Sequence, residues 1–448
     1  MRRGVSRSSL LAFGLGLAVG ARAVAQVPLP TPPATEPEPE PEAAVNESEG
    51  YTPPADGPGA PSPLSIDGFI DVGFAKAQGD GTSFAPGDQS VPLDYGVDPF
   101  APAVNSRGDV ASTDSDERFV NGFLPRSVGI GGRPSFLLNT LDVDLKYTPP
   151  SVPLMVFSRV QFLPRFTGAG DDTRVFVEQA FGRLVPFDSQ EFAVSAGKFD
   201  SVFGIEYLDN QANIRIGITP SLVARYTTGQ SVGAKLFYRM QIAPLWSALS
   251  LNVAATNSGN FVEALQPPDA SLSGEPVGSG RLGYELNTPI VQAKLGASGM
   301  TGPRNDQADR SARQKAFGFD ARLAAFGVYL NAEYVHVDED PGGPKTTSIG
   351  VFPLSSGFSV RGGYAQLAYE LPLSVGALHK LTVYGRYDRR HAWFDGFTPI
   401  TVDRITGGLR ADLWDVLILK AEYLDNRELS GAPTVANNVF TTSLVYSW

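Results

Sequence analysis

The chain ends in the stretch Asn438–Trp448, NVFTTSLVYSW, in which large and small side chains alternate. One face of a strand built from it carries Phe440, Leu444, Tyr446 and Trp448. A soluble protein rarely leaves such an apolar strand at its edge, because that promotes aggregation. A strand that faces lipid and ends in an aromatic girdle at the interface has a reason to look this way. The stretch therefore predicts a membrane-facing strand, and the last strand of a β-sandwich is the alternative.

The aromatic terminus resembles the last strand of bacterial outer-membrane β-barrels. This resemblance implies that Leu444, Tyr446 and Trp448 form an assembly signal recognised by the barrel-assembly machinery. It also implies a location in the outer membrane of a Gram-negative bacterium, with outer-membrane lipid as a further partner.

The opposite end of the chain has the features of a secretory signal peptide. Arg2, Arg3 and Arg7 precede an apolar core, and small residues at 23–25 form a cleavage site. We therefore predict that residues 1–25 are removed on export. No later run reaches the roughly 18 apolar residues of a membrane-spanning helix. A membrane protein without such helices must form a closed barrel, which satisfies its backbone hydrogen bonds in hydrocarbon.

Residues 26–64 contain twelve of the chain's 36 prolines, and residues 36–42 alternate Glu with Pro. This composition predicts an extended, disordered periplasmic linker. The chain has no cysteine, so it does not depend on disulfides. Loss of the four arginines of the signal peptide takes the formal charge from −11 to −15. An acidic chain of this kind argues against nucleic acid as a partner.

Residues 65–448 alternate apolar and polar residues in segments of about ten, the period of a lipid-out, lumen-in strand. In one such segment Val143 and Leu145 alternate with Asp142 and Asp144. We predict an all-β transmembrane antiparallel barrel of about sixteen strands, an even number as in single-chain bacterial barrels. The predicted strands are 66–76, 136–147, 154–163, 174–184, 191–199, 231–240, 247–256, 279–287, 290–299, 315–323, 327–337, 359–371, 379–389, 402–412, 416–425 and 438–448.

The connections between these strands alternate in length, as periplasmic turns and extracellular loops do. The predicted short ones are 148–153, 186–190, 241–246, 287–289, 324–326, 372–378 and 413–415. The predicted long ones are 77–135, 164–173, 200–230, 257–278, 300–314, 338–358, 390–401 and 426–437. A β-sandwich has no reason to sort its loops this way, so the alternation favours a barrel with both ends in the periplasm.

A barrel of 16–18 strands encloses an aqueous channel, which needs a constriction to select among solutes. The best candidate for that constriction is the loop 200–230, because it is unusually apolar for a surface loop. Such a loop is expected to fold against the inner wall. Charged candidates within it are Glu206, Asp209, Arg215 and Arg225. Opposed charges there would orient solutes, or the two arginines would instead fix the loop to the wall; both alternatives stay open.

Short motifs resemble the phosphate-selective-porin-like family of outer-membrane proteins. They are Gly68–Phe74, Gly197–Phe199, Val202–Glu206, Gly217–Ser221 and the terminal Trp448. The resemblance spans roughly residues 65–448 and implies a sixteen-stranded porin, usually a homotrimer, for small anionic or neutral solutes. The pores of that family carry a ladder of arginines and lysines, which this chain matches only in part, so phosphate specificity is not carried over.

Twelve basic and nine acidic residues fall on the predicted inner face of the strands. Charge rings of one sign give ion selectivity, so this mixture predicts at most a weak anion preference for small solutes and ions. Alternatively, the charges pair across strands and simply line a wet wall. The pore-lining candidates are Lys235, Arg239, Arg322, Arg386, Arg404, Arg410 and Lys420.

A barrel of this kind has two alternative functions. An adhesive or structural barrel would use the long loop 77–135 as its interaction element. A barrel-borne hydrolase would need a nucleophile beside one of His336, His379 and His391, and no serine stands in such a context. The acidic segment 337–343 suggests Ca²⁺ but lacks EF-hand spacing. We therefore expect a channel that has no enzymatic activity, metal or cofactor.

Overall fold

The computed structural model describes residues 63–77, 112–113, 119–120, 135–162, 175–187, 191–242, 246–257, 274–304, 311–341, 345–347, 350–352, 357–395, 399–430 and 438–448. The predicted signal peptide 1–25, nearly all of the linker 26–64 and most of loop 77–135 lie outside these residues. Among the described residues, no helix has the length and hydropathy needed to cross a membrane.

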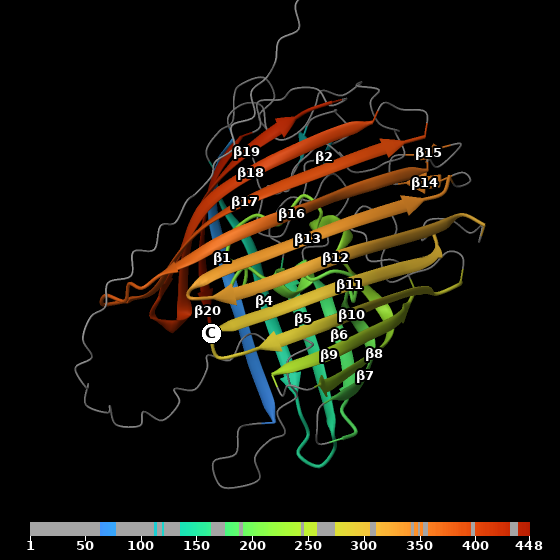
Figure 1. Cartoon of the computed structure of the whole chain (residues 1–448), viewed down its shortest axis with the longest axis horizontal. Helices are drawn as coiled ribbons and strands as arrows, with labels where there is room; N and C mark the ends of the chain where they lie inside the picture. Colours follow the sequence, from blue (N-terminus) through green and yellow to red (C-terminus); the bar gives the residue numbers. More distant parts are fainter. Residues whose placement is uncertain are drawn as a thin grey trace, which may run out of the picture. The chain divides into compact units, whose positions relative to one another are not determined.

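Sixteen strands form one closed antiparallel barrel, which confirms the predicted fold and strand number (Figure 1). Each strand overlaps its predicted range. The strands are β1 (Leu64–Ala77), β4 (Ser135–Tyr147), β5 (Leu154–Phe162), β6 (Val175–Leu184), β7 (Phe192–Asp200), β8 (Gln230–Ile242), β9 (Ser247–Thr256), β10 (Val277–Asn287), β11 (Val291–Pro303), β12 (Arg313–Ala325), β13 (Val328–Glu339), β16 (Phe358–Leu371), β17 (Leu378–Phe394), β18 (Ile400–Leu413), β19 (Leu417–Glu428) and β20 (Val439–Ser447).

The first and last strands close the ring. β1 pairs with β20 from Phe69 opposite Ser447 to Ala77 opposite Val439. One step beyond this ladder, the Trp448 amide donates to the Gly68 carbonyl at 3.1 Å. The Ser443 hydroxyl also donates to Asp71 Oδ1 at 2.6 Å on the inner side of the seam. The terminal stretch is therefore the closing strand of the barrel.

The two faces of β20 differ as predicted. Thr441, Ser443 and Val445 point inward and are buried, whereas Leu444 and Tyr446 point outward and are exposed. The other strands repeat this alternation, and their exposed outward residues are mostly Leu, Val, Ile, Phe and Tyr. Since water favours the opposite arrangement, a ring that is apolar outside and largely polar inside is built for lipid.

The shortest turn shows how local chemistry sets the strand ends. β12 and β13 are joined only by Phe326 and Gly327, with φ of 53° and 75°. Positive φ at both central positions defines a type I′ turn, whose twist matches that of paired strands. The register then runs without a break from Ala325 opposite Val328 to Gln314 opposite Glu339.

Two details of the connections differ from prediction. The connection 395–399 is short, because β17 runs to Phe394 and β18 already begins at Ile400. The predicted alternation of loop lengths therefore fails at this position. Two small hairpins also lie within predicted loops. They pair β2 (Ser112–Thr113) with β3 (Phe119–Val120), and β14 (Lys345–Thr347) with β15 (Gly350–Phe352). Strands of two or three residues are too short to show a period.

Candidate functional site: the loop inside the barrel

Residues 201–229 connect β7 to β8 and include two short 3-10 helices, η1 (Glu206–Asp209) and η2 (Ala224–Tyr226). Four apolar residues of this segment are buried in one cluster with inward-facing residues of β10 to β18. The residues that the segment contributes to this cluster are Phe203, Leu222, Val223 and Tyr226. The predicted inward folding of this loop is confirmed. We call residues 201–229 the inner loop.

The inner loop meets the wall in two further places. Val202 packs with Phe157 and Phe181, on β5 and β6. Ala212 packs in a cluster with Phe69 and Val445, on the two strands that close the ring. Because these contacts lie on different arcs of the barrel, the inner loop crosses the lumen instead of following one side of it.

Cationic side chains of the wall bind the carbonyl groups of the inner loop. Arg386 donates to the Thr219 and Pro220 carbonyls at 2.8 and 2.9 Å, and Arg404 also donates to the Pro220 carbonyl. Lys420 donates to three loop carbonyls, among them Gly217 at 3.0 Å. Arg410 and Arg322 hold two further carbonyls, those of Ile214 and Ile205, at 2.9 and 3.0 Å, and Arg410 shares the Arg215 carbonyl with Lys420.

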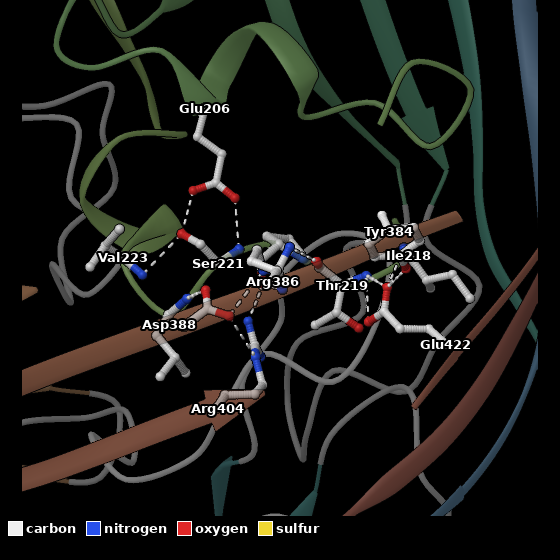
Figure 2. Close-up of polar contacts among 12 residues, drawn as sticks. Glu206, Ile218, Thr219, Ser221, Val223, Tyr384, Arg386, Asp388, Arg404 and Glu422 are labelled. Atoms are coloured by element: carbon white, nitrogen blue, oxygen red, sulfur yellow. Dashed lines mark hydrogen bonds and ion pairs between the residues drawn. The ribbon is translucent and has the colours of Figure 1, made fainter. Parts of the chain in front are cut away.

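Carboxylates of the wall bind the amide groups of the same segment. Glu333 accepts from the Ile205 and Glu206 amides at 3.0 and 3.2 Å. Glu422 accepts from Ile218 at 2.7 Å and Thr219 at 3.3 Å, and Asp388 accepts from Leu222 at 3.1 Å. Figure 2 shows Asp388 and Glu422 beside the loop residues Ile218, Thr219 and Ser221.

This arrangement has a simple physical origin. A buried segment without strand or helix partners would leave its peptide groups unsatisfied, at a cost of about 1–3 kcal/mol each. Hydrogen bonds to ionised groups are about twice as strong as neutral ones. The wall therefore supplies cations for the carbonyls and carboxylates for the amides. The charges also compensate each other, since Asp388 lies 2.9 Å from Arg386 and 3.5 Å from Arg404.

The structure corrects part of the predicted pore lining. Arg386, Arg404 and Lys420 lie on the inner wall, but they are buried against the inner loop and do not face open water. Lys235 is also buried, with its ammonium 4.8 Å from the centre of the Phe199 ring. Arg239 alone among these residues keeps a side chain that is 36% exposed, and it pairs with Glu285 at 3.1 Å.

Arg215 bonds within its own loop. Its guanidinium donates to the carbonyls of Asp209, Asn210 and Ile218 at 2.7 to 3.1 Å, and only 5% of the residue is exposed. Burial lowers the pKa of Arg215 to about 10, against the opposing effect of Glu206. Through these bonds Arg215 shapes the loop. The side chain of Arg225 lies outside the described part of the chain.

Glu206 stabilises the turn of the inner loop. Its carboxylate accepts from the Ser221 amide at 2.7 Å and from the Ser221 hydroxyl (Figure 2). Burial raises the pKa of Glu206, while Arg386 and the Ser221 bonds oppose that rise. This carboxylate joins two parts of the loop that lie fifteen residues apart in sequence.

Asp209 is the predicted constriction residue that reaches the wall. Its carboxylate pairs with Arg322 at 2.8 Å, and both side chains are about a quarter exposed. They line a cavity of about 250 Å³ between the inner loop and β11 to β17, together with Glu206, Arg215 and Lys294. The structure thus brings three of the four predicted constriction residues to one charged cavity.

Sequence reasoning missed the role of Glu333, Asp388 and Glu422. These three belong to the nine acidic residues predicted on the inner face of the strands, and the structure shows that they bind amides of the inner loop. The available signal was the apolar character of the loop. A loop that folds inward brings many peptide groups with it, and these need charged partners on the facing wall.

The fold is porin-like. No family model and no curated protein matches the chain. The solved channel DcaP of Acinetobacter baumannii matches with a TM-score of 0.50 and 11% identity, over 86% of this chain and 97% of that one. Salmonella typhi OmpF in complex with daunomycin matches at 0.49 with 13% identity, over 86% and 97% of the two chains. At such identities the likeness shows the fold alone, that of outer-membrane barrels of Gram-negative bacteria.

The histidines and the acidic segment 337–343 form no metal site in the described residues. There, no group of three or more His, Cys, Asp or Glu side chains is placed to hold a metal ion. His336 contacts Asp338 at 3.0 Å, and His379 contacts Asp415 at 2.9 Å in an exposed position. Residues 342 and 343 of the acidic segment lie outside the description.

Replacing Gly204 by alanine is expected to destabilise the inner loop strongly. Gly204 has φ of 79°, where alanine is strained by about 1–2 kcal/mol. A methyl group added at Gly204 would also collide with the Glu333 carboxylate, which binds two loop amides.

Gly376→Ala is the control for this prediction. Gly376 has φ of 61°, and a Cβ added there would meet nothing within 4 Å, so this substitution measures backbone strain alone. We expect the free energy of unfolding in detergent to fall by roughly 3 kcal/mol or more for Gly204→Ala and about 1 kcal/mol for Gly376→Ala. Equal losses would show that Glu333 does not hold the loop.

Proposed function

We propose that the protein is an outer-membrane porin, a water-filled diffusion channel for small hydrophilic solutes. One observation carries this proposal: the inner loop crosses a sixteen-stranded barrel and is fixed to the wall by ionised side chains. A barrel of this size encloses an aqueous lumen, and a segment held across it sets the bore. The exposed lumen side chains of Arg239 and Lys380 support a wet periplasmic vestibule.

We also propose a weak preference for anions. Five of the twelve basic residues that the charge count assigns to the lumen bind loop carbonyls, so these five contribute less to selectivity than their charge suggests. Lys294 and Lys380 lie on the inner face toward the periplasmic end, and Lys380 pairs with Glu370 at 2.5 Å. Paired charges at an entrance bias the passage of ions only mildly.

Planar-bilayer recording tests the channel directly. We expect stepwise, ohmic single-channel currents and a reversal potential in a KCl gradient that indicates weak anion preference. In Lys294→Gln/Lys380→Gln, the anion-to-cation permeability ratio should fall by roughly twofold, since screened charges near a wet pore act at about this level. Lys198→Gln is the control, because Lys198 lies on β7, away from both lysines. A folded barrel without conductance would contradict the channel, and clear cation selectivity of the wild type would contradict the anion preference.

The proposed partners follow from the same function. The family resemblance supports a homotrimer, and the outward faces of Leu444, Tyr446 and Trp448 support recognition by the barrel-assembly machinery. We further propose that the protein is not an enzyme. His391 lies 2.6 Å from the Thr401 hydroxyl, but its ring packs on Trp393 rather than on an orienting carboxylate.

A further inference from the structure

The outer face of the barrel carries a groove of about 780 Å³ across β12, β13, β16 and β17. Its floor consists of small outward-facing residues. These are Ala321, Ala332, Gly363 and Ala365, on three adjacent strands. A volume of this size falls in the range of about 300–1,000 Å³ that is typical of sites for small organic ligands.

Aromatic side chains form the walls of the groove. Phe319 and Tyr334 stand on one side and Tyr387 on the other, and all three are exposed outward-facing residues. The register places Ala365 directly between Ala332 and Tyr387. Small residues flanked by rings leave a depression with no polar side chain along its floor.

On the periplasmic side of the groove, the next outward-facing positions on β17 and β18 are glycines. Leu367 is opposite Gly385, and Gly385 is opposite Gly407 on the next strand. An added Cβ at Gly407 would meet nothing within 4 Å.

Toward the extracellular side the groove is lined by two outward-facing arginines, Arg361 and Arg389, and then by His391, Thr401 and Ser430. Arg389 is 55% exposed in its side chain, and Asp403 lies 3.7 Å from its Nε. Asp403 also accepts from the Tyr387 hydroxyl at 2.8 Å. The Arg361 guanidinium lies 5.5 Å from the Trp393 ring centre. Cations on the lipid face of a barrel are costly unless they lie near the interface or meet an anion.

We propose that this groove binds an anionic phospholipid or glycolipid of the outer leaflet, with its phosphate on Arg361 and Arg389 and an acyl chain between the aromatic walls. Guanidinium groups bind phosphate in a bidentate manner, and two of them beside an apolar depression match an amphiphile of this kind. The inference rests on the outer-membrane fold and not on what passes through the lumen.

Native mass spectrometry of the full chain in detergent, titrated with diphosphoryl lipid A, tests the proposal. The wild type should retain the lipid, and Arg361→Gln/Arg389→Gln should weaken binding by on the order of 100-fold, because two charge-assisted contacts are lost. Ala365→Leu, which fills the floor, should also weaken it. The matched control is Arg427→Gln: the Arg427 side chain is 53% exposed on β19, outside the groove. It should bind within about twofold of the wild type.

Several outcomes would overturn the proposal. Equal retention of the dephosphorylated lipid, or wild-type binding by Arg361→Gln/Arg389→Gln, would exclude the phosphate site. Displacement of the lipid by equimolar inorganic phosphate would indicate a site for free anions instead. If Ala365→Leu dissociates an oligomer and leaves lipid retention unchanged, the groove is an interface between copies. A chain that binds the lipid but does not conduct would refute the channel and leave this site standing.

Discussion

Replacing Asp388 by alanine is expected to release the inner loop and to raise the single-channel conductance. Asp388 is fully buried, lies beside Arg386 and Arg404, and accepts from the Leu222 amide. Its removal leaves two guanidinium groups without their carboxylate, and breaking a buried pair in this way costs about 3–5 kcal/mol. The ratio of docked to undocked loop should fall by on the order of 10² to 10³. We expect larger conductance steps with frequent switching between levels.

Two further variants make this result interpretable. Asp388→Asn keeps an acceptor for Leu222 and loses only the charge, so its conductance should fall between those of the wild type and Asp388→Ala. Glu285→Ala removes a lumen carboxylate that pairs with Arg239, on an arc of the wall away from Asp388, and should leave the conductance steps steady. Heat-modifiable gel mobility shows which variants are folded. A folded Asp388→Ala barrel with wild-type conductance would mean that the inner loop does not set the bore.

The second large effect is expected at the seam of the barrel, where Trp448 covers Gly68. A Cβ added at Gly68 would lie 2.5 Å from the Trp448 ring and would also collide with the Asp142 carbonyl. Gly68→Val should therefore displace the ring that ends the closing strand, at a cost of about 1–3 kcal/mol. Gly407→Val is the control, because Gly407 also lies in a strand and has open space around it. We expect the folded fraction to fall several-fold for Gly68→Val only.

Trp448→Ala distinguishes two roles of Trp448, packing on Gly68 where β1 meets β20 and recognition by the assembly machinery. Folding of purified chain into detergent needs no assembly machinery, whereas folding in cells does. If Trp448 acts through its packing on Gly68, Trp448→Ala lowers the folded yield in both settings. If it acts only as a signal, the yield falls in cells alone. Normal yields in both settings would remove Trp448 from either role.

The barrel could be predicted from the sequence because each strand shows the alternation of apolar and polar residues within its own short segment. Period-two alternation places Leu444 and Tyr446 outside and Ser443 inside, and each strand carries the same information independently. The inner loop was also recognisable, since residues such as Phe203 and Val223 have no reason to face water. Its place in the lumen followed from composition and loop length together.

The contacts of the inner loop could not be read in the same way. Alternation tells which face of a strand Lys420 occupies, but not which segment approaches that face. Lys420 meets the Ala212 carbonyl across 208 residues of sequence, and Arg386 meets Thr219 across 167. No local pattern links such pairs, so basic residues that bind the loop look the same in sequence as basic residues that line water.

The wall recognises the inner loop chiefly through its main chain. Arg386, Arg404 and Lys420 take carbonyl oxygens, and Glu422 takes amides, so most of these contacts do not specify which side chains the loop carries. Substitutions at loop positions that face the passage would then leave the anchorage intact. Point mutations can therefore change the side chains that line the constriction without disturbing the hydrogen bonds that hold the inner loop. The selectivity of such a barrel can then evolve largely independently of its folding.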